Sequence, residues 1–166
     1  MRILTERFGE VEVQPENVLV FPQGLLGFEE YKKYVILDEK DSFFWFLQSV
    51  EEAELVFVVL MPELLRSDYQ VCLEGPMVKE LGFTDASEGQ VYVIVTVPEN
   101  IAEMTANLQA PLVINTKKKL AKQVVLMDGK YHTKHNVLAE FQRTTFEQKK
   151  KDQSVDQPNQ ELRRSV

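Results

Sequence analysis

Few residues in this sequence have the types and spacing that chemistry requires. His132 and His135 are the only histidines, and histidine is the commonest metal ligand and the side chain that most readily exchanges a proton near neutral pH. In an extended segment their odd spacing would place them on opposite faces, so a shared metal would need a turn between them. We therefore expect structural or solvent-exposed roles for both.

Cys72 is the only cysteine, so one chain can form neither an internal disulfide nor a metal site built from several thiolates. Its apolar, strand-like neighbours predict a buried, unreactive thiol rather than a nucleophile. The glycine patterns that bind nucleotide phosphates, Gly-x-x-x-x-Gly-Lys-Ser/Thr and Gly-x-Gly-x-x-Gly, do not occur among the seven glycines. The sequence thus predicts a protein that is not an enzyme and has no catalytic residues, metal or cofactor.

Three carboxylates, Glu51, Glu52 and Glu54, follow one another closely in the sequence. A carboxylate pair can perform acid–base chemistry when its surroundings separate the two pKa values, but no neighbouring group indicates such surroundings. Two interpretations stay open. The segment is a solvated acidic loop, or it is a contact patch for a basic protein.

A basic segment, residues 115–135, supports a different hypothesis. Lys117, Lys118, Lys119 and Lys122 precede Tyr131, a combination that could follow a phosphate backbone on an RNA- or single-strand-binding β-barrel. That mode of binding usually adds aromatic side chains exposed along a groove. The aromatic cluster at residues 43–46 is instead expected to be buried, so we keep this function as the alternative and not as the main hypothesis.

The net charge of −7 over 166 residues is unevenly distributed. Residues 1–114 contain seven Lys or Arg and twenty Asp or Glu, a net charge of −13, whereas residues 115–166 contain twelve and six, a net charge of +6. An acidic body repels phosphate backbones and attracts basic proteins. No apolar run reaches the ~18 residues of a membrane span, and charges occupy the start where a signal peptide would be apolar. We expect a cytoplasmic protein without membrane contact.

The elements that must position these residues are mostly strands. Residues 90–97 alternate in the manner of a strand, while residues 43–47 and 55–61 are apolar on both faces and typical of central strands. Residues 104–108 also favour a strand. Asp128-Gly129 predicts a tight turn in a hairpin. Many short strands joined by turns predict a mainly β fold, a small antiparallel β-barrel-like domain with one or two short helices.

Two helices and a tail complete the prediction. Pro76 can begin a short helix that ends before Gly82, and a second helix from Ala139 to about Lys150 would bury Phe141. From Lys149 the chain has too few apolar residues to offset its ordering entropy, which predicts mobility. The expected organisation is therefore a barrel-like domain at 1–138, then a short helix and a mobile polar tail at 139–166.

An ordered set of short motifs resembles the flagellar assembly factor (FliW) family over residues 1–138. The motifs are Phe8-Gly9, Phe21-Pro-Gln-Gly24-Leu-Leu-Gly27-Phe28, Phe46-Leu-Gln-Ser49, Asn107-Leu-Gln-Ala-Pro111-Leu-Val-Ile-Asn115 and Gln123-Val-Val-Leu126. Each motif is also consistent with a purely structural role, because glycines serve turns and polar residues such as Asn107 and Asn115 tie down loops.

The resemblance implies a β-barrel-like fold and two protein partners, flagellin and the RNA-binding translational regulator CsrA. It implies that flagellin binds the factor in the cytoplasm, and that the freed factor binds the regulator and relieves repression of flagellin messenger RNA. We expect the partner-binding residues to include Glu51, Glu52, Glu54, Asn107, Asn115 and Phe141. No direct binding of nucleic acid is expected.

Overall fold

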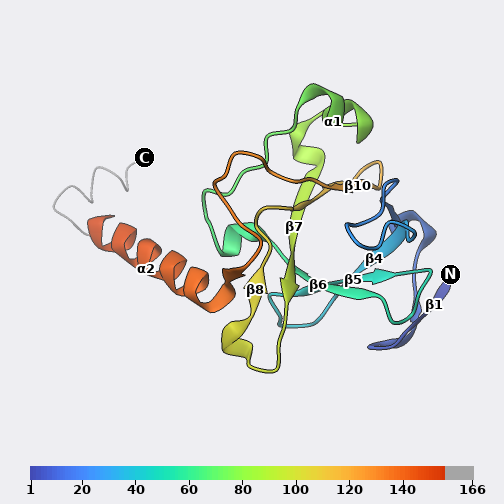
Figure 1. Ribbon diagram of the computed structural model, residues 1–166, viewed down its shortest axis with the longest axis horizontal. Helices are drawn as coiled ribbons and strands as arrows, with labels where there is room; N and C mark the ends of the chain where they lie inside the picture. The colour runs from blue at the N-terminus through green and yellow to red at the C-terminus, as the bar shows by residue number, and fades with distance from the viewer. Residues whose placement is uncertain (156–166) are drawn as a thin grey trace.

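The computed structural model describes the backbone of residues 1–155 and the side chains of residues 1–150. Within this part of the chain, seven strands form a closed barrel (Figure 1). They are β3 (Leu19–Val20), β4 (Lys33–Asp38), β5 (Trp45–Ser49), β6 (Val56–Leu60), β7 (Gly89–Thr96), β9 (Leu112–Asn115) and β10 (Leu120–Gln123). This confirms the mainly β barrel fold that the sequence predicts.

The long strand β7 closes the barrel because it pairs with different strands along its length. Its first half, from Gly89 to Tyr92, lies antiparallel to β9, and its second half pairs with β6 and with the short strand β8 (Thr105–Ala106). The remaining barrel pairings are also antiparallel except the one between β3 and β10, which is parallel. Closure leaves fewer unpaired edges, which is why a barrel suits so many short strands.

In the described part of the chain, three strands besides β8 also lie outside the barrel. β1 (Arg2–Thr5) and β2 (Gly9–Glu12) form a hairpin, and β11 (His135–Asn136) pairs with β8. The hairpin packs Ile3 against Val35 of β4. The strand predicted at residues 104–108 exists but is reduced to β8, because Met104 ends the 3-10 turn at residues 101–103 and Asn107 begins a turn closed by its own side chain.

The two-sided apolar strands separate two hydrophobic cores. On β7, Tyr92 faces the barrel interior while its neighbour Val93 faces a second hydrophobic cluster. On β6, Val59 faces the barrel interior and Leu60 faces that second cluster. Successive strand side chains point to opposite faces, so both faces of a strand between two cores must be apolar. The barrel interior contains Leu19, Phe21, Leu25, Tyr34, Leu47, Val59, Tyr92, Leu112, Ile114 and Ala121.

The helices are short apart from the last. The structure contains α1 (Gly75–Glu80) and α2 (Val137–Val155), with 3-10 turns η1 (Pro15–Asn17), η2 (Pro62–Leu64), η3 (Ala86–Glu88) and η4 (Ile101–Glu103). α1 is the helix predicted after Gly75, with Pro76 in its first turn and Gly82 at φ 70° after its end. No helix within residues 1–155 is long and apolar enough to cross a membrane.

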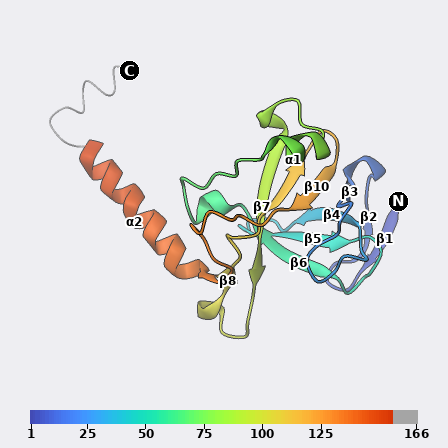
Figure 2. The same cartoon turned by 45° about the horizontal axis from the view of Figure 1, so that its top comes forward.

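α2 differs from its prediction in length and packing. It continues to Val155, so residues 149–155, which were expected to be mobile, are helical, and the rest of the predicted tail lies outside the described residues. Phe141 is not buried: 39% of it is exposed, and its ring lies 5.9 Å from that of Phe43. Figures 1 and 2 show α2 projecting from the barrel, so the helix does not pack into a core that could bury Phe141.

The predicted hairpin at Asp128-Gly129 is wrong, although its turn exists. Gly129 has φ 73° and the Asp128 carboxylate accepts the Lys130 N–H, but no strands flank them. The preceding segment instead bonds to the 109–111 segment, where the Leu126 N–H donates to the Gln109 carbonyl. Tyr131 then packs its ring 4.9 Å from Tyr69. Tertiary contacts thus replace the local pairing that an Asp-Gly turn favours.

Candidate functional site

Two neighbouring loops, residues 27–31 and 51–55, form an acidic hollow of about 410 Å³ on the surface. Its lining combines carboxylates with aromatic rings, and consists of Gly27, Phe28, Glu30, Tyr31, Glu52, Glu54 and Leu55. Glu52 and Glu54 were predicted from the sequence as contact residues. Glu30, Tyr31 and Phe28 were not, although the Gly27-Phe28 motif followed by two glutamates was a visible signal.

Strand β5 holds the second loop from inside the protein. Gln48 is fully buried, and its Nε2 lies 3.0–3.3 Å from the carbonyl oxygens of Ser49, Glu52, Ala53 and Leu55. The Ser49 hydroxyl oxygen accepts the N–H groups of Glu51 and Glu52 at 3.0 Å. The Phe46-Leu-Gln-Ser49 motif therefore fixes the loop that presents Glu52 and Glu54.

Glu51 fastens the two loops together. Its Oε1 accepts the backbone N–H groups of Lys32 and Lys33, each at 2.8 Å. Although Glu51 is exposed, one of its oxygens is committed to the neighbouring loop. We conclude that Glu51 shapes the acidic hollow, whereas the carboxylates available to a partner there are those of Glu30, Glu52 and Glu54.

Two substitutions of Glu51 distinguish the effect of its charge from the effect of its role as a hydrogen-bond acceptor. Glu51→Gln retains an oxygen for the two N–H groups, whereas Glu51→Leu removes it and leaves both donors to solvent. We expect Glu51→Leu to accelerate hydrogen exchange at Lys32 and Lys33 by about fivefold or more, in line with one lost hydrogen bond. Glu51→Gln should leave the exchange nearly unchanged. Equal exchange in both variants would show that Glu51 does not join the loops.

The charges around Tyr31 show the sign of the potential in the acidic hollow. The pKa of Tyr31 is raised above its ordinary value, chiefly by the negative charge of Glu30, then by partial burial and by Glu52 and Glu51. Phe28 is 38% exposed, and its ring meets that of Phe57 edge-on at 5.2 Å. Carboxylates beside aromatic rings form a setting suited to a basic side chain.

Asn107 and Asn115 each close a loop through hydrogen bonds from backbone N–H groups to the side-chain oxygen. The side-chain oxygen of Asn107 accepts the N–H groups of Gln109 and Ala110, and that of Asn115 accepts those of Lys117 and Lys118. Asn115 is fully buried and also donates to the Leu81 carbonyl at 2.9 Å. Asn115 therefore has no exposed surface to offer a partner, and any effect on binding would pass through the loop it holds.

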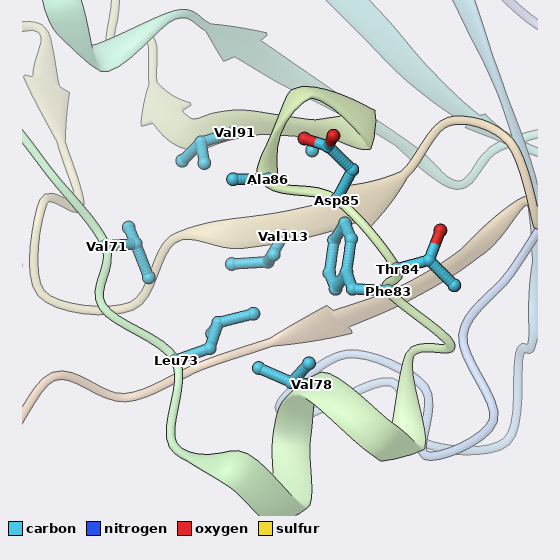
Figure 3. A pocket seen from close by; sticks show the side chains of 10 residues that line it. Val71, Leu73, Val78, Phe83, Thr84, Asp85, Ala86, Val91 and Val113 are labelled. Atoms are coloured by element: carbon cyan, nitrogen blue, oxygen red, sulfur yellow. The ribbon is translucent and has the colours of Figure 1, made fainter.

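A second hollow, of about 360 Å³, is apolar (Figure 3). Its walls come from α1, the 83–89 segment, the 71–73 segment and strands β7 and β9, and its main apolar lining is Val71, Leu73, Val78, Phe83, Val91 and Val113. Thr84 and Asp85 also line it. Cys72 lies between two residues of this lining and is exposed, so the prediction of a buried thiol is wrong. In an extended segment the neighbours of an inward residue point outward.

The two histidines lie together, contrary to the expectation of opposite faces. Their rings stack at 3.7 Å because the chain bends at Thr133 between them, and the His132 N–H donates to the His135 Nε2. Among the described residues there is no group of three or more His, Cys, Asp or Glu that could hold a metal ion.

The basic segment lacks the exposed aromatic groove of a single-strand-binding barrel. Tyr131 is 6% exposed, and Lys122 pairs with Glu80 at 3.0 Å. In the aromatic cluster, Phe46 is buried as expected, while Phe43 is 60% exposed beside α2. These positions weaken the alternative of an RNA-binding surface at residues 115–135.

Comparison with known proteins identifies close relatives. The family described as FliW protein matches residues 2–137. The flagellar assembly factor FliW of Alkaliphilus metalliredigens is 47% identical over 146 residues, covering 86% of this chain and 90% of that relative. That of Treponema denticola is 43% identical over 142 residues, covering 85% and 96%. A crystal structure of the flagellar assembly factor FliW superposes with a TM-score of 0.77 at 38% identity, covering 82% of this chain and 96% of that one.

Proposed function

This chain belongs to the FliW family of flagellar assembly factors, and on that premise we propose that it binds two proteins in turn, flagellin and a CsrA-type translational regulator. Flagellin occupies the factor in the cytoplasm. When flagellin is exported, the free factor binds the regulator and relieves its repression of flagellin messenger RNA. The protein then acts by occupancy and performs no catalysis.

The acidic hollow is the observation that supports this proposal best. A regulator that binds RNA presents basic side chains, and Glu30, Glu52 and Glu54 surround aromatic rings that suit such side chains. Once docked, these carboxylates would lower the local potential near the RNA-binding surface. RNA phosphates within about one Debye length, ~8 Å at physiological salt, would be repelled even if their site were not filled.

A triple variant tests the role of this charge. In Glu30→Gln/Glu52→Gln/Glu54→Gln the shape of the acidic hollow is kept and three charges are removed, while Glu51 is left to join the loops. We expect affinity for the regulator to fall by about three- to tenfold, since exposed charge pairs contribute little each. RNA release from the saturated complex should be impaired more strongly, as measured by displacement of labelled RNA.

A matched control removes three exposed carboxylates that do not line the hollow: Glu16, Glu63 and Glu99. It has the same net charge as the triple variant and should release RNA as the unaltered chain does. If both variants release RNA equally well, the acidic hollow does not act by repulsion. The partner assignment has its own test, because the purified chain should recover flagellin from an extract of flagellated cells.

A further inference from the structure

Helix α2 begins where the family match ends, at residue 137, and leaves the barrel (Figures 1 and 2). Its contacts with the body gather in its first two turns. Val137 is buried, the Asn136 side chain accepts the Ala139 N–H, and the Thr144 hydroxyl donates to the Leu65 carbonyl at 2.5 Å. Residues 145–150 are exposed. A few side chains therefore decide whether α2 stays on the barrel.

Glu140 stands at the centre of these contacts. Its carboxylate accepts two hydrogen bonds from the Arg66 guanidinium, at 2.5 and 3.1 Å, and lies 3.3 Å from the His135 Nδ1. Both Arg66 and Glu140 are mostly shielded from solvent, with 21% and 14% of their side chains exposed. We call Arg66, His135 and Glu140 the α2 contact cluster.

The hydrogen bonds of His135 require its neutral form. Its Nε2 accepts the backbone N–H of His132 at 3.0 Å, so the single ring proton lies on Nδ1 and is donated to Glu140. A second proton would have to sit on Nε2, where it would face the N–H of His132. Two N–H donors would then face each other beside a side chain that is only 5% exposed.

The charges facing His135 come from three segments. Glu140 on α2 would stabilise an imidazolium, and Arg143 lies 3.8 Å from that same carboxylate. Arg66, which follows η2, and the stacked ring of His132 oppose a positive charge on His135. Because Glu140 is already bound by Arg66, little of its charge remains to compensate a protonated His135.

We propose that the α2 contact cluster is a proton-sensitive switch, in which protonation of His135 releases α2 from the barrel. Release frees His135 together with α2: it breaks the hydrogen bond between His132 and His135 and the ion pair between Arg66 on the barrel and Glu140 on α2, and it uncovers Val137 and the ring of Phe43. Arg66 and His135 lie within the family match, and Glu140 lies just beyond it on α2. The switch is independent of which partners the barrel binds.

The direction of the pH dependence follows from burial. Burial is the largest cause that lowers the pKa of His135, and the hydrogen bond with Glu140 offsets it only in part. Docked His135 thus binds a proton less readily than released His135, whose pKa is ordinary, near 6.5. The docking of α2 is therefore most stable at pH values above the pKa of released His135 and weakens as the pH falls below that pKa. Arg66 lowers the pKa of Glu140, so the contribution of that carboxylate is lost only under more acidic conditions.

Hydrogen exchange in the full chain tests the switch. Between pH 7.5 and 5.5, and after correction for intrinsic rates, we expect protection of residues 137–144 to fall by up to about tenfold, the limit for one proton over this range. Protection in β7 should not change. His135→Gln, which cannot titrate, should abolish the pH dependence, whereas His132→Phe, which retains a ring for stacking, should keep it.

A titration of the His135 ring by NMR in the unaltered chain guards against a variant that fails to fold. The loss of protection in α2 should follow the same midpoint as the ring. If His135 gains its proton while α2 remains equally protected, or if His135→Gln folds and keeps the full pH dependence, the switch does not exist. Binding of flagellin or of the regulator enters neither measurement, so this inference can fail while the proposed function stands.

Discussion

Replacing Gln48 with glutamate is expected to lower the free energy of unfolding by about 3 kcal/mol or more at neutral pH, because a carboxylate would meet a ring of backbone oxygens. Gln48 is fully buried, and its amide nitrogen lies within 3.3 Å of four carbonyls. A glutamate there has only acceptors when charged, so each of these contacts becomes repulsive. Urea denaturation of the purified variant measures the loss.

The pH dependence makes this prediction specific. The glutamate introduced at position 48 would have a folded-state pKa raised above its unfolded value of about 4.3. The variant therefore loses stability as the pH rises above that value, by at most about 1.4 kcal/mol per pH unit. Gln48→Met keeps the volume but removes the donor, and should cost about 1–3 kcal/mol at every pH. A glutamate variant whose deficit does not grow with pH would contradict this account.

Replacing Gly24 with alanine is expected to destabilise the fold by about 3–4 kcal/mol, through strain and a steric clash together. Gly24 has φ 67°, and a Cβ there would lie 2.6–2.9 Å from backbone atoms of Glu29. Both segments are backbone, so neither can rotate away as a side chain would. The 25–29 turn would have to move, and it carries Phe28 into the acidic hollow.

Gly27 in the same motif is the matched control. It also has positive φ, at 88°, but apart from its two chain neighbours no residue has an atom within 4 Å of the position a Cβ would take. Gly27→Ala should therefore show the backbone strain alone, about 1–2 kcal/mol. Thermal or chemical unfolding of both variants gives the comparison. Equal losses would mean that the close approach to Glu29 is relieved at little cost.

The strands were predictable because their evidence is local. Residues 90–97 alternate and residues 55–61 are apolar on both faces, and the structure places them in β7 and β6 between two cores. Any packing that buries one face of a strand requires apolar residues at every second position, so this pattern is visible in the sequence. Pro76 and Gly82 mark α1 for the same reason, since each acts on the backbone at its own position.

The candidate site was predictable only in part. Glu52 and Glu54 were visible as a charge cluster, but Glu30 and Tyr31, about twenty positions earlier in the sequence, join them through the antiparallel pairing of β4 with β5. Glu51 looked identical to its neighbours until its hydrogen bonds to Lys32 and Lys33 distinguished it. The errors at Cys72 and at Asp128-Gly129 share this cause, since long-range packing decided both positions.

The sequence by itself determined that this is an acidic, mainly β protein, and its ordered motifs identified the family that the comparisons show. These properties depend on composition and on short-range spacing, which a linear chain displays directly. Only the tertiary structure decided which carboxylates surround the acidic hollow and that His132 and His135 stack beside Glu140. Such groupings depend on the pairing of β4 with β5 and on how residues 131–135 pack beside α2, and neither can be read from the separation of residues along the chain.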